Sequence, residues 1–142
     1  MFKCLHQSIR RMNDITVRIK ESLSKKPNIV YAILFGSAAE DRLREDSDID
    51  VAIRFFPEPD VMELGEISSL IESVVGRAVH VVNIVRAPPP LRYEIFKNGV
   101  LILVRDEGLL AEDKARAIME YLDFRPHYEN MAKGLMRALG NA

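Results

Sequence analysis

The sequence predicts an α/β fold in which helices and strands alternate along the chain. Two observations predict it. Apolar residues recur at spacings of three and four in some segments, and short β-branched runs separate those segments. The length of 142 residues suits one domain and leaves little room for a second. The whole chain, residues 1–142, is therefore expected to form a single domain.

Composition and charge exclude several classes of protein. The net charge of −1 gives no overall attraction to nucleic acid, so direct nucleic-acid binding is not expected. The single cysteine, Cys4, excludes a disulfide framework and a cysteine-based zinc site. No apolar run reaches the length of a signal peptide or a membrane span. We therefore expect a cytoplasmic protein that does not bind membranes.

The first segment is expected to form a helix followed by a strand. Its apolar residues keep helical spacing, which predicts a helix over about residues 4–25 that ends near Pro27. The near-continuous apolar run 28–35 is typical of a strand at the centre of a sheet, because both of its faces are buried.

A second strand and a second helix are expected next. Residues 47–54 alternate, so Asp48 and Asp50 lie on one face of a strand and apolar residues on the other. From about Pro59 to Val75 the apolar spacing is again helical, and Gly76 is the residue expected to end that helix.

The second half of the chain predicts a strand, a short helix and another strand. The β-branched run 77–85 indicates the first of these strands. The proline run 88–90 begins a short helix that Gly99 stops, and residues 100–104 form the fourth strand.

A helical tail over about residues 107–139 is expected to complete the domain. The helix runs from about Glu107 toward Phe124, and Pro126 is expected to end or kink it. Beyond the proline an apolar stripe continues at helical spacing, and such a stripe is more often part of a core than a docking surface. The stripe consists of Phe124, Tyr128, Met131, Leu135 and Leu139.

Two short motifs carry the predicted chemistry. Gly36 and Ser37 follow the first strand, and Asp48 and Asp50 follow after ten further residues. Gly36 lets a phosphate approach the backbone, and Ser37 offers a hydroxyl and, if a helix begins there, backbone N–H groups. Two carboxylates on one face of a strand hold Mg²⁺ while substrate phosphates supply its other ligands. The motifs together favour nucleotidyl transfer from a triphosphate.

Each motif also has a plain structural interpretation. Gly36 and Ser37 could form an ordinary turn and helix cap, and Asp48 and Asp50 could be the solvated face of an edge strand. Either interpretation would suffice for one motif alone. Both motifs at this spacing, on consecutive strands, favour the functional interpretation.

The sequence FGS, nine residues and SDIDV resembles the signature of the polymerase-β-like nucleotidyltransferase superfamily, and specifically its minimal, MNT or MntA-like, branch. The resemblance runs from about Asn28 to Phe124 and includes the stretch 76–106. It implies a nucleotidyltransferase fold with a mixed central sheet flanked by helices. It also implies ATP as substrate, Mg²⁺ or Mn²⁺ as cofactor, and Ser47 as a nucleotide-binding residue beside Gly36 and Ser37.

The resemblance also implies a partner. In MntA, AMP is transferred from ATP to a tyrosine hydroxyl of a HEPN ribonuclease toxin, which is thereby silenced. We therefore expect an antitoxin that forms a hetero-oligomer with a HEPN-family toxin encoded by a neighbouring gene. The alternative is an antitoxin that has lost catalysis and masks its toxin sterically. Transfer to a small molecule is disfavoured, because such enzymes generally add a substrate domain.

The sequence departs from the family pattern at three positions. Glu40 and Asp41 stand where the family usually has Arg and Gly, which adds negative charge near the expected triphosphate. His80 stands on the third strand where a third catalytic carboxylate is usual. His80 could be a metal ligand better suited to Mn²⁺ than to Mg²⁺, a general base, or an inert replacement.

Three basic residues near the third strand are expected to be solvated rather than to bind triphosphate or a partner. They are Arg86, Arg92 and Lys97.

Overall fold

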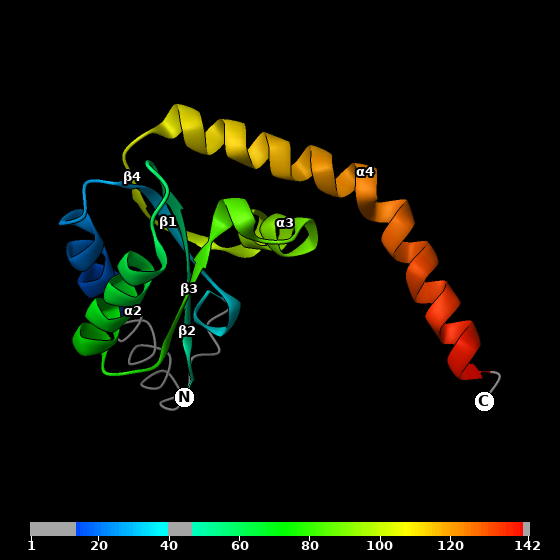
Figure 1. The fold of residues 1–142 in the computed structure, drawn as a ribbon, viewed down its shortest axis with the longest axis horizontal. Coiled ribbons are helices and arrows are strands. Elements are labelled where there is room, and N and C mark those ends of the chain that lie inside the picture. Colours follow the sequence, from blue (N-terminus) through cyan, green and yellow to red (C-terminus); the bar gives the residue numbers. More distant parts are fainter. Residues whose placement is uncertain (1–13, 40–46, 141–142) are drawn as a thin grey trace, which may run out of the picture.

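The computed structural model describes residues 14–39 and 47–140 of the chain. A four-stranded sheet lies at its centre, with helices against both faces (Figure 1). This is the predicted α/β architecture with a mixed central sheet flanked by helices.

The sheet consists of β1 (Ile29–Phe35), β2 (Ile49–Phe55), β3 (Val79–Asn83) and β4 (Val100–Val104). Their order across the sheet is β3-β2-β1-β4. β1 runs antiparallel to β2 and β4, whereas β2 and β3 run parallel. The four predicted strands are confirmed. β2 lies inside the sheet and is no edge strand, and β3 is shorter than predicted because a 3-10 turn follows it at Ile84–Arg86.

The helices also follow the predicted order. Residues 14–24 are helical, which confirms where the predicted N-terminal helix ends, and its expected beginning lies outside the described residues. The other helices are α2 (Val61–Val75), α3 (Pro89–Asn98) and α4 (Glu107–Gly140).

The ends of α2 follow from the chemistry of two residues. The Asp60 side chain accepts a hydrogen bond from the backbone N–H of Glu63 at 2.8 Å, which satisfies a donor in the first turn. Gly76 takes a left-handed conformation, with φ of 70°, and its N–H donates to the carbonyl of Glu72. Gly76 therefore ends this helix as predicted.

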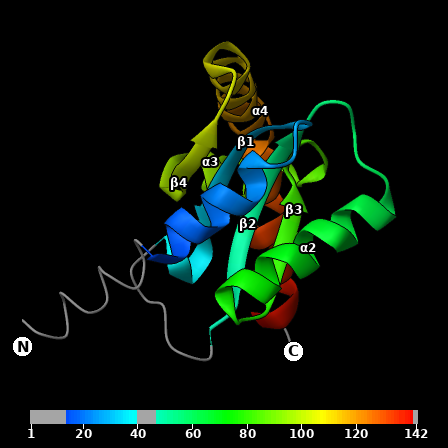
Figure 2. The same ribbon diagram turned by 90° about the vertical axis from the view of Figure 1, so that its left-hand side faces the viewer.

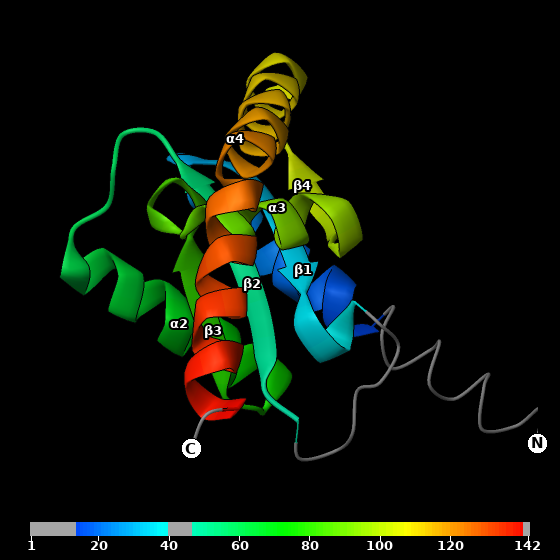
Figure 3. The ribbon, with the colours of Figure 1, turned by 90° about the vertical axis from the view of Figure 1, so that its right-hand side faces the viewer.

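Two apolar cores lie on the two faces of the sheet. The helix over residues 14–24 and α2 pack on one face (Figure 2). Helices α3 and α4 cover part of the other face (Figure 3). Ile33 and Ala52 belong to this second core, and alternation along β2 places Asp50 on the same face as Ala52. Asp50 therefore faces the side of the sheet that carries α3 and α4.

Helix α4 is continuous through Pro126 and reaches Gly140. The expectation that Pro126 ends the helix is therefore wrong, but the alternative expectation of a kink agrees with the change in direction of the helix axis (Figure 1). Proline removes one N–H and clashes with the carbonyl four residues earlier, and a bend relieves the clash while the helix continues on both sides.

The second half of α4 stands away from the sheet (Figures 1 and 3). Met131, Leu135 and Leu139 are exposed by 60%, 62% and 69%. The expectation that the apolar stripe joins the core is therefore wrong for these residues, because no part of the described domain extends far enough to cover them. None of the described helices, α4 included, has the length and apolarity needed to cross a membrane.

Candidate functional site

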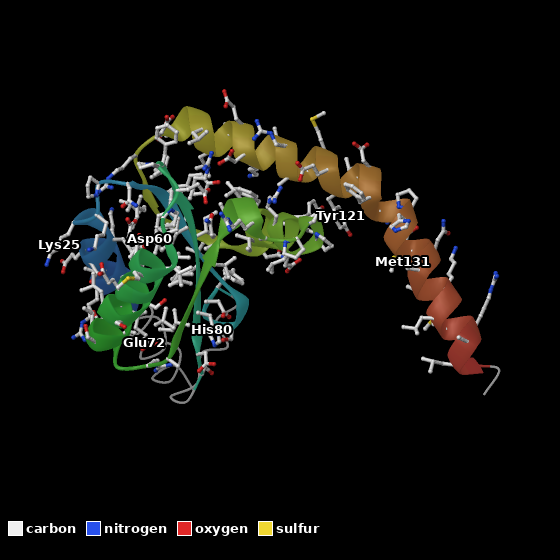
Figure 4. All side chains as sticks on the ribbon, in the orientation of Figure 1. Lys25, Asp60, Glu72, His80, Tyr121 and Met131 are labelled. Carbon is white, nitrogen blue, oxygen red and sulfur yellow. The ribbon has the colours of Figure 1, made fainter. Side chains whose placement is uncertain are left out.

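The predicted site residues meet where β1 ends and where β2 and β3 begin. Phe35, the last residue of β1, pairs with Asp50 on β2, and Asp50 pairs with His80 on β3. Gly36 follows Phe35 directly, so strand pairing alone brings Gly36, Asp50 and His80 to one end of the sheet. Figure 4 shows His80 at this end.

Gly36 and Asp50 are in close contact. Gly36 has φ of 70°, a conformation that residues with a side chain rarely adopt. A β-carbon built on Gly36 would lie 2.5 Å from Oδ2 of Asp50. Two features therefore require glycine at position 36: the backbone conformation of the turn and the Asp50 carboxylate beside it.

Asp48 and His80 interact directly. Nε2 of His80 lies 3.1 Å from Oδ2 of Asp48, and both side chains are more than half exposed. An ionised carboxylate can only accept a hydrogen bond, so Nε2 carries the proton and donates it. A cation that binds Asp48 would therefore compete with His80 for the same oxygen.

Burial is the main influence on the Asp50 carboxyl. Partial burial raises its pKa, His80 lowers it, and the charge of Asp48 raises it by less. The carboxylates thus form a partly desolvated negative site in which ionised Asp50 is unfavourable. A bound cation would offset this cost.

The chemistry of the donors fits a divalent cation that is shared with a substrate. In the described residues, no group of three or more His, Cys, Asp and Glu side chains is arranged to hold a metal. Asp48 and Asp50 supply carboxylate oxygens, and Mg²⁺ commonly takes one or two carboxylates and completes its coordination with phosphates and water. The space that Gly36 leaves beside Asp50 is compatible with such an approach.

The two predicted serines lie at the edges of this site. Ser37 is half-buried in a 3-10 turn, Gly36–Ala38, and Ser47 is half-buried just before β2. A helix that begins at Ser37 is not seen, since only this turn is described before residue 40. Glu40 and Asp41, predicted to add negative charge near the triphosphate, lie outside the described residues.

Two of the hollows on the face of the sheet that carries α3 and α4 have residues of β1 in their lining. One, of about 260 Å³, adjoins the site and is lined by Phe35, Gly36 and Ala39 and by Leu91, Glu94 and Asn98 of α3. The other, of about 480 Å³, includes Tyr31 and Asp113 in its lining and lies toward the opposite end of β1. The smaller hollow is the one that shares a residue with the predicted phosphate turn.

Arg92 differs from its sequence-based prediction. Its side chain is only 17% exposed and donates to the carbonyls of Ile84, Val85 and Ala87 and to Glu120 at 2.6 Å. It therefore holds the turn after β3 against α4, and the expectation of a solvated side chain is wrong. Backbone carbonyls that a 3-10 turn presents to one side chain leave no pattern in the sequence, so this role could not be predicted.

The other two basic residues make only surface contacts. Arg86 is exposed, and its Nε lies 3.6 Å from Oε2 of Glu58. The ammonium group of Lys97 lies 5.7 Å from the centre of the Tyr93 ring. Both agree with the expectation of solvated side chains.

A second polar cluster lies under α4, and sequence reasoning did not identify it. The carboxylate of Asp113 accepts hydrogen bonds from the hydroxyl of Tyr31 at 2.8 Å and from Nε of Arg54 at 3.0 Å. Burial is the main cause that raises the pKa of Tyr31, and the hydrogen bond to Asp113 adds to it. Arg54 continues the polar alternation of Asp48 and Asp50, which was the available signal.

Comparison with known proteins identifies the family. The model of the family described as polymerase beta, nucleotidyltransferase matches residues 18–108, more than half of the chain. The chain belongs to this family. Two proteins of Methanocaldococcus jannaschii, MJ0128 and MJ1215, are similar over 76 residues with 29% and 24% identity, and both bear protein adenylyltransferase as a provisional name. The match covers 54% of this chain and 78% and 88% of theirs.

Solved structures share the fold. A chain of a toxin–antitoxin crystal structure determined with AMP-PNP aligns with a TM-score of 0.77 at 19% identity, over 85% of this chain and 98% of that chain. A chain of the MntA–HepT toxin–antitoxin structure gives 0.71 at 18% identity, over 86% and 97%. A chain from a complex of tri-AMPylated Shewanella oneidensis HEPN toxin with MNT antitoxin gives 0.73 at 17% identity, over 88% and 98%.

Proposed function

We propose that this chain is a divalent-metal-dependent antitoxin that transfers AMP from ATP to a hydroxyl, in particular a tyrosine hydroxyl, of a HEPN-family toxin encoded by a neighbouring gene. The single observation that carries the proposal is the meeting of Gly36 with Asp50, and of Asp48 with His80, at one end of the sheet. The whole chain would act as one nucleotidyltransferase domain with a helical tail, in the cytoplasm.

Each residue of the site has a role in the proposed reaction. Gly36, Ser37 and Ser47 receive the phosphates, and Asp48 and Asp50 hold Mg²⁺ or Mn²⁺. When bound, the cation neutralises charge on the α-phosphate and on the departing pyrophosphate. The acceptor oxygen forms a bond to the α-phosphorus while the bond between the α-phosphorus and the bridging oxygen to the β-phosphate breaks. His80 donates to Asp48 through Nε2, and we propose that its other ring nitrogen, Nδ1, takes the proton of the acceptor hydroxyl.

The second half of α4 supports a protein acceptor. Its exposed apolar side chains have no partner surface in the described domain, and an apolar stripe of this size on a protruding helix is typical of a docking surface. Figure 4 shows Met131 on the part of α4 that stands away from the sheet. The toxin–antitoxin complexes that share the fold make a HEPN toxin the acceptor we propose.

A second function is favoured by a specific observation. His80 stands where relatives are expected to carry a third carboxylate, and the described residues contain no group of three metal-binding side chains. An antitoxin that binds nucleotide but neutralises its toxin by steric binding would be compatible with a site that lacks the third carboxylate.

Co-expression with the toxin separates the two functions. Wild type should relieve growth arrest, and the intact mass of the toxin should increase by whole AMP units. Asp48→Asn should abolish the mass increase, whereas Asp123→Asn, a matched change at an exposed position of α4, should not. Full rescue by Asp48→Asn without a mass increase would establish the steric function instead.

A further inference from the structure

The 260 Å³ hollow beside Gly36 is mainly apolar, and Glu94 and Asn98 form its polar wall. Phe35 and Leu91 contribute apolar side chains, whereas Glu94 and Asn98 contribute polar groups from consecutive turns of α3. Gly36 belongs both to this hollow and to the contact with Asp50. The hollow therefore continues directly from the place at which phosphates are proposed to bind.

The position of the hollow suits the sugar of a nucleotide. In the proposed reaction the α-phosphate lies beside Asp48 and Asp50, and the ribose is attached to it through one ester oxygen. The sugar must therefore occupy concave space next to the phosphate turn. The larger hollow includes Tyr31, which precedes Phe35 by four residues on β1, or by about 13 Å along an extended strand. The smaller hollow is the nearer of the two.

The hydrogen bonds of the polar wall indicate what it can bind. Nδ2 of Asn98 donates to Oε1 of Glu94 at 2.6 Å, which holds the carboxylate in place. In the part of the chain that the structure describes, Oε2 of Glu94 and Oδ1 of Asn98 then have no hydrogen-bond partner. Both atoms accept hydrogen bonds, so they match a ligand group that presents two donors. The vicinal hydroxyls of ribose are such a group, and carboxylates hold ribose hydroxyls in dinucleotide-binding folds.

We propose that Glu94, held by Asn98, binds the 2′- and 3′-hydroxyls of the nucleotide and makes the site selective for ribonucleotides over 2′-deoxyribonucleotides. This inference rests on the proposed function, because it takes the phosphate site at Gly36 as given. The apolar side chains of Phe35 and Leu91 would contact the carbon face of the sugar.

Calorimetry with three metal-bound probes tests the proposal: ATP, 2′-deoxyATP and inorganic tripolyphosphate, each with excess Mg²⁺. Wild type should bind ATP about ten-fold or more tightly than 2′-deoxyATP, as expected for one hydrogen bond to a charged group. Glu94→Ala should bind both nucleotides with nearly equal affinity and leave tripolyphosphate binding unchanged. Asn98→Ala should give an intermediate ratio, because it frees the carboxylate without removing it.

Glu112→Ala is the matched control, since Glu112 is also an exposed helical glutamate and lies on α4 away from the hollow. It should keep the wild-type ratio. Equal affinities of wild type for ATP and 2′-deoxyATP, or an unchanged ratio in Glu94→Ala, would overturn the inference while leaving nucleotide transfer intact. If none of the three probes binds, the proposed function fails as well, and the inference fails with it.

Discussion

Oδ2 of Asp50 occupies the space that a β-carbon on residue 36 would need, at 2.5 Å from its ideal position. The turn after β1 thus leaves room for the carboxylate on β2, although 13 residues separate Gly36 from Asp50 in the sequence. Pairing of Phe35 with Asp50 across the two strands fixes this relationship. Sheet register therefore brings the two sequence motifs together across the segment that separates them.

Gly36→Ala should disable the site through this contact, and Gly76→Ala is its matched control. Both glycines have φ of 70°, but a β-carbon on Gly76 would meet nothing within 4 Å. Each substitution should cost about 1–2 kcal/mol of unfolding free energy from the left-handed backbone. Only Gly36→Ala should also weaken metal-dependent ATP binding, by about ten-fold or more, since it displaces the Asp50 carboxylate. Denaturant unfolding and calorimetry would measure both effects, and equal ATP affinity in the two variants would contradict the role of this contact.

Asp50→Asn should abolish metal-dependent ATP binding without loss of stability. Burial raises the pKa of Asp50, so the folded protein holds this proton more tightly than the unfolded chain does. The resulting stabilisation is fully present below the unfolded pKa and is lost as the pH rises through the folded pKa. At neutral pH the ionised carboxylate is therefore a cost, which Asn removes.

The measurement is a pair of thermal unfolding curves at neutral pH, with EDTA present in both. Asp50→Asn should unfold at the same temperature as wild type or at a higher one. Added Mg²⁺ with ATP should raise the unfolding temperature of wild type alone. A clearly lower unfolding temperature for Asp50→Asn would show that this carboxylate serves the fold.

Substitution of His80 tests whether the group beside Asp48 takes part in transfer. We expect His80→Ala to lower the rate of AMP transfer by about 10²-fold or more, as is usual when a general base is removed. His80→Asp should retain transfer with Mg²⁺, because it provides a third carboxylate at this end of the sheet. Rates would be measured from the intact mass of the toxin over time. An unchanged rate in His80→Ala would mark the histidine as an inert replacement.

Asp113→Ala should destabilise the fold without changing the proposed nucleotide site. It leaves the guanidinium of Arg54, which is 16% exposed, and the buried hydroxyl of Tyr31 without their shared partner. Removal of one member of a buried ion pair typically costs about 3–5 kcal/mol. Denaturant unfolding would measure this loss, and Asp123→Ala on the exposed side of α4 should cost less than about 0.5 kcal/mol. A similar small loss in both variants would contradict a structural role for the cluster.

The elements that could be predicted from the sequence are those that depend only on their own residues. β1 is a continuous apolar run, and α2 is bounded by Asp60 and Gly76, so local chemistry alone located them. The phosphate and metal motifs were visible for the same reason, since each is short and lies at a strand end. Their meeting depended on strand order, which the resemblance to a known family supplied.

Features that depend on contacts between distant elements could not be predicted. Arg92 was expected to be solvated because the sequence does not show that the preceding 3-10 turn presents three carbonyls to its guanidinium group. The apolar stripe of α4 was expected to enter the core because helical spacing does not reveal whether a partner surface exists in the same chain. The contact between Glu94 and Asn98 became informative only once α3 was seen beside Gly36.

The protruding half of α4 also has a consequence for the lifetime of the chain. The segment of α4 after Pro126 ends at Gly140, and an isolated helix as short as this segment is only marginally stable in water. It should therefore unwind far more often than the part of α4 that is held against the sheet. Unwound backbone is what proteases cleave. Any protein that binds this segment would therefore protect the chain from degradation. Chains without a bound partner would be degraded before those that have one. In this way the length of one helix would couple the abundance of the protein to the presence of the proposed partner.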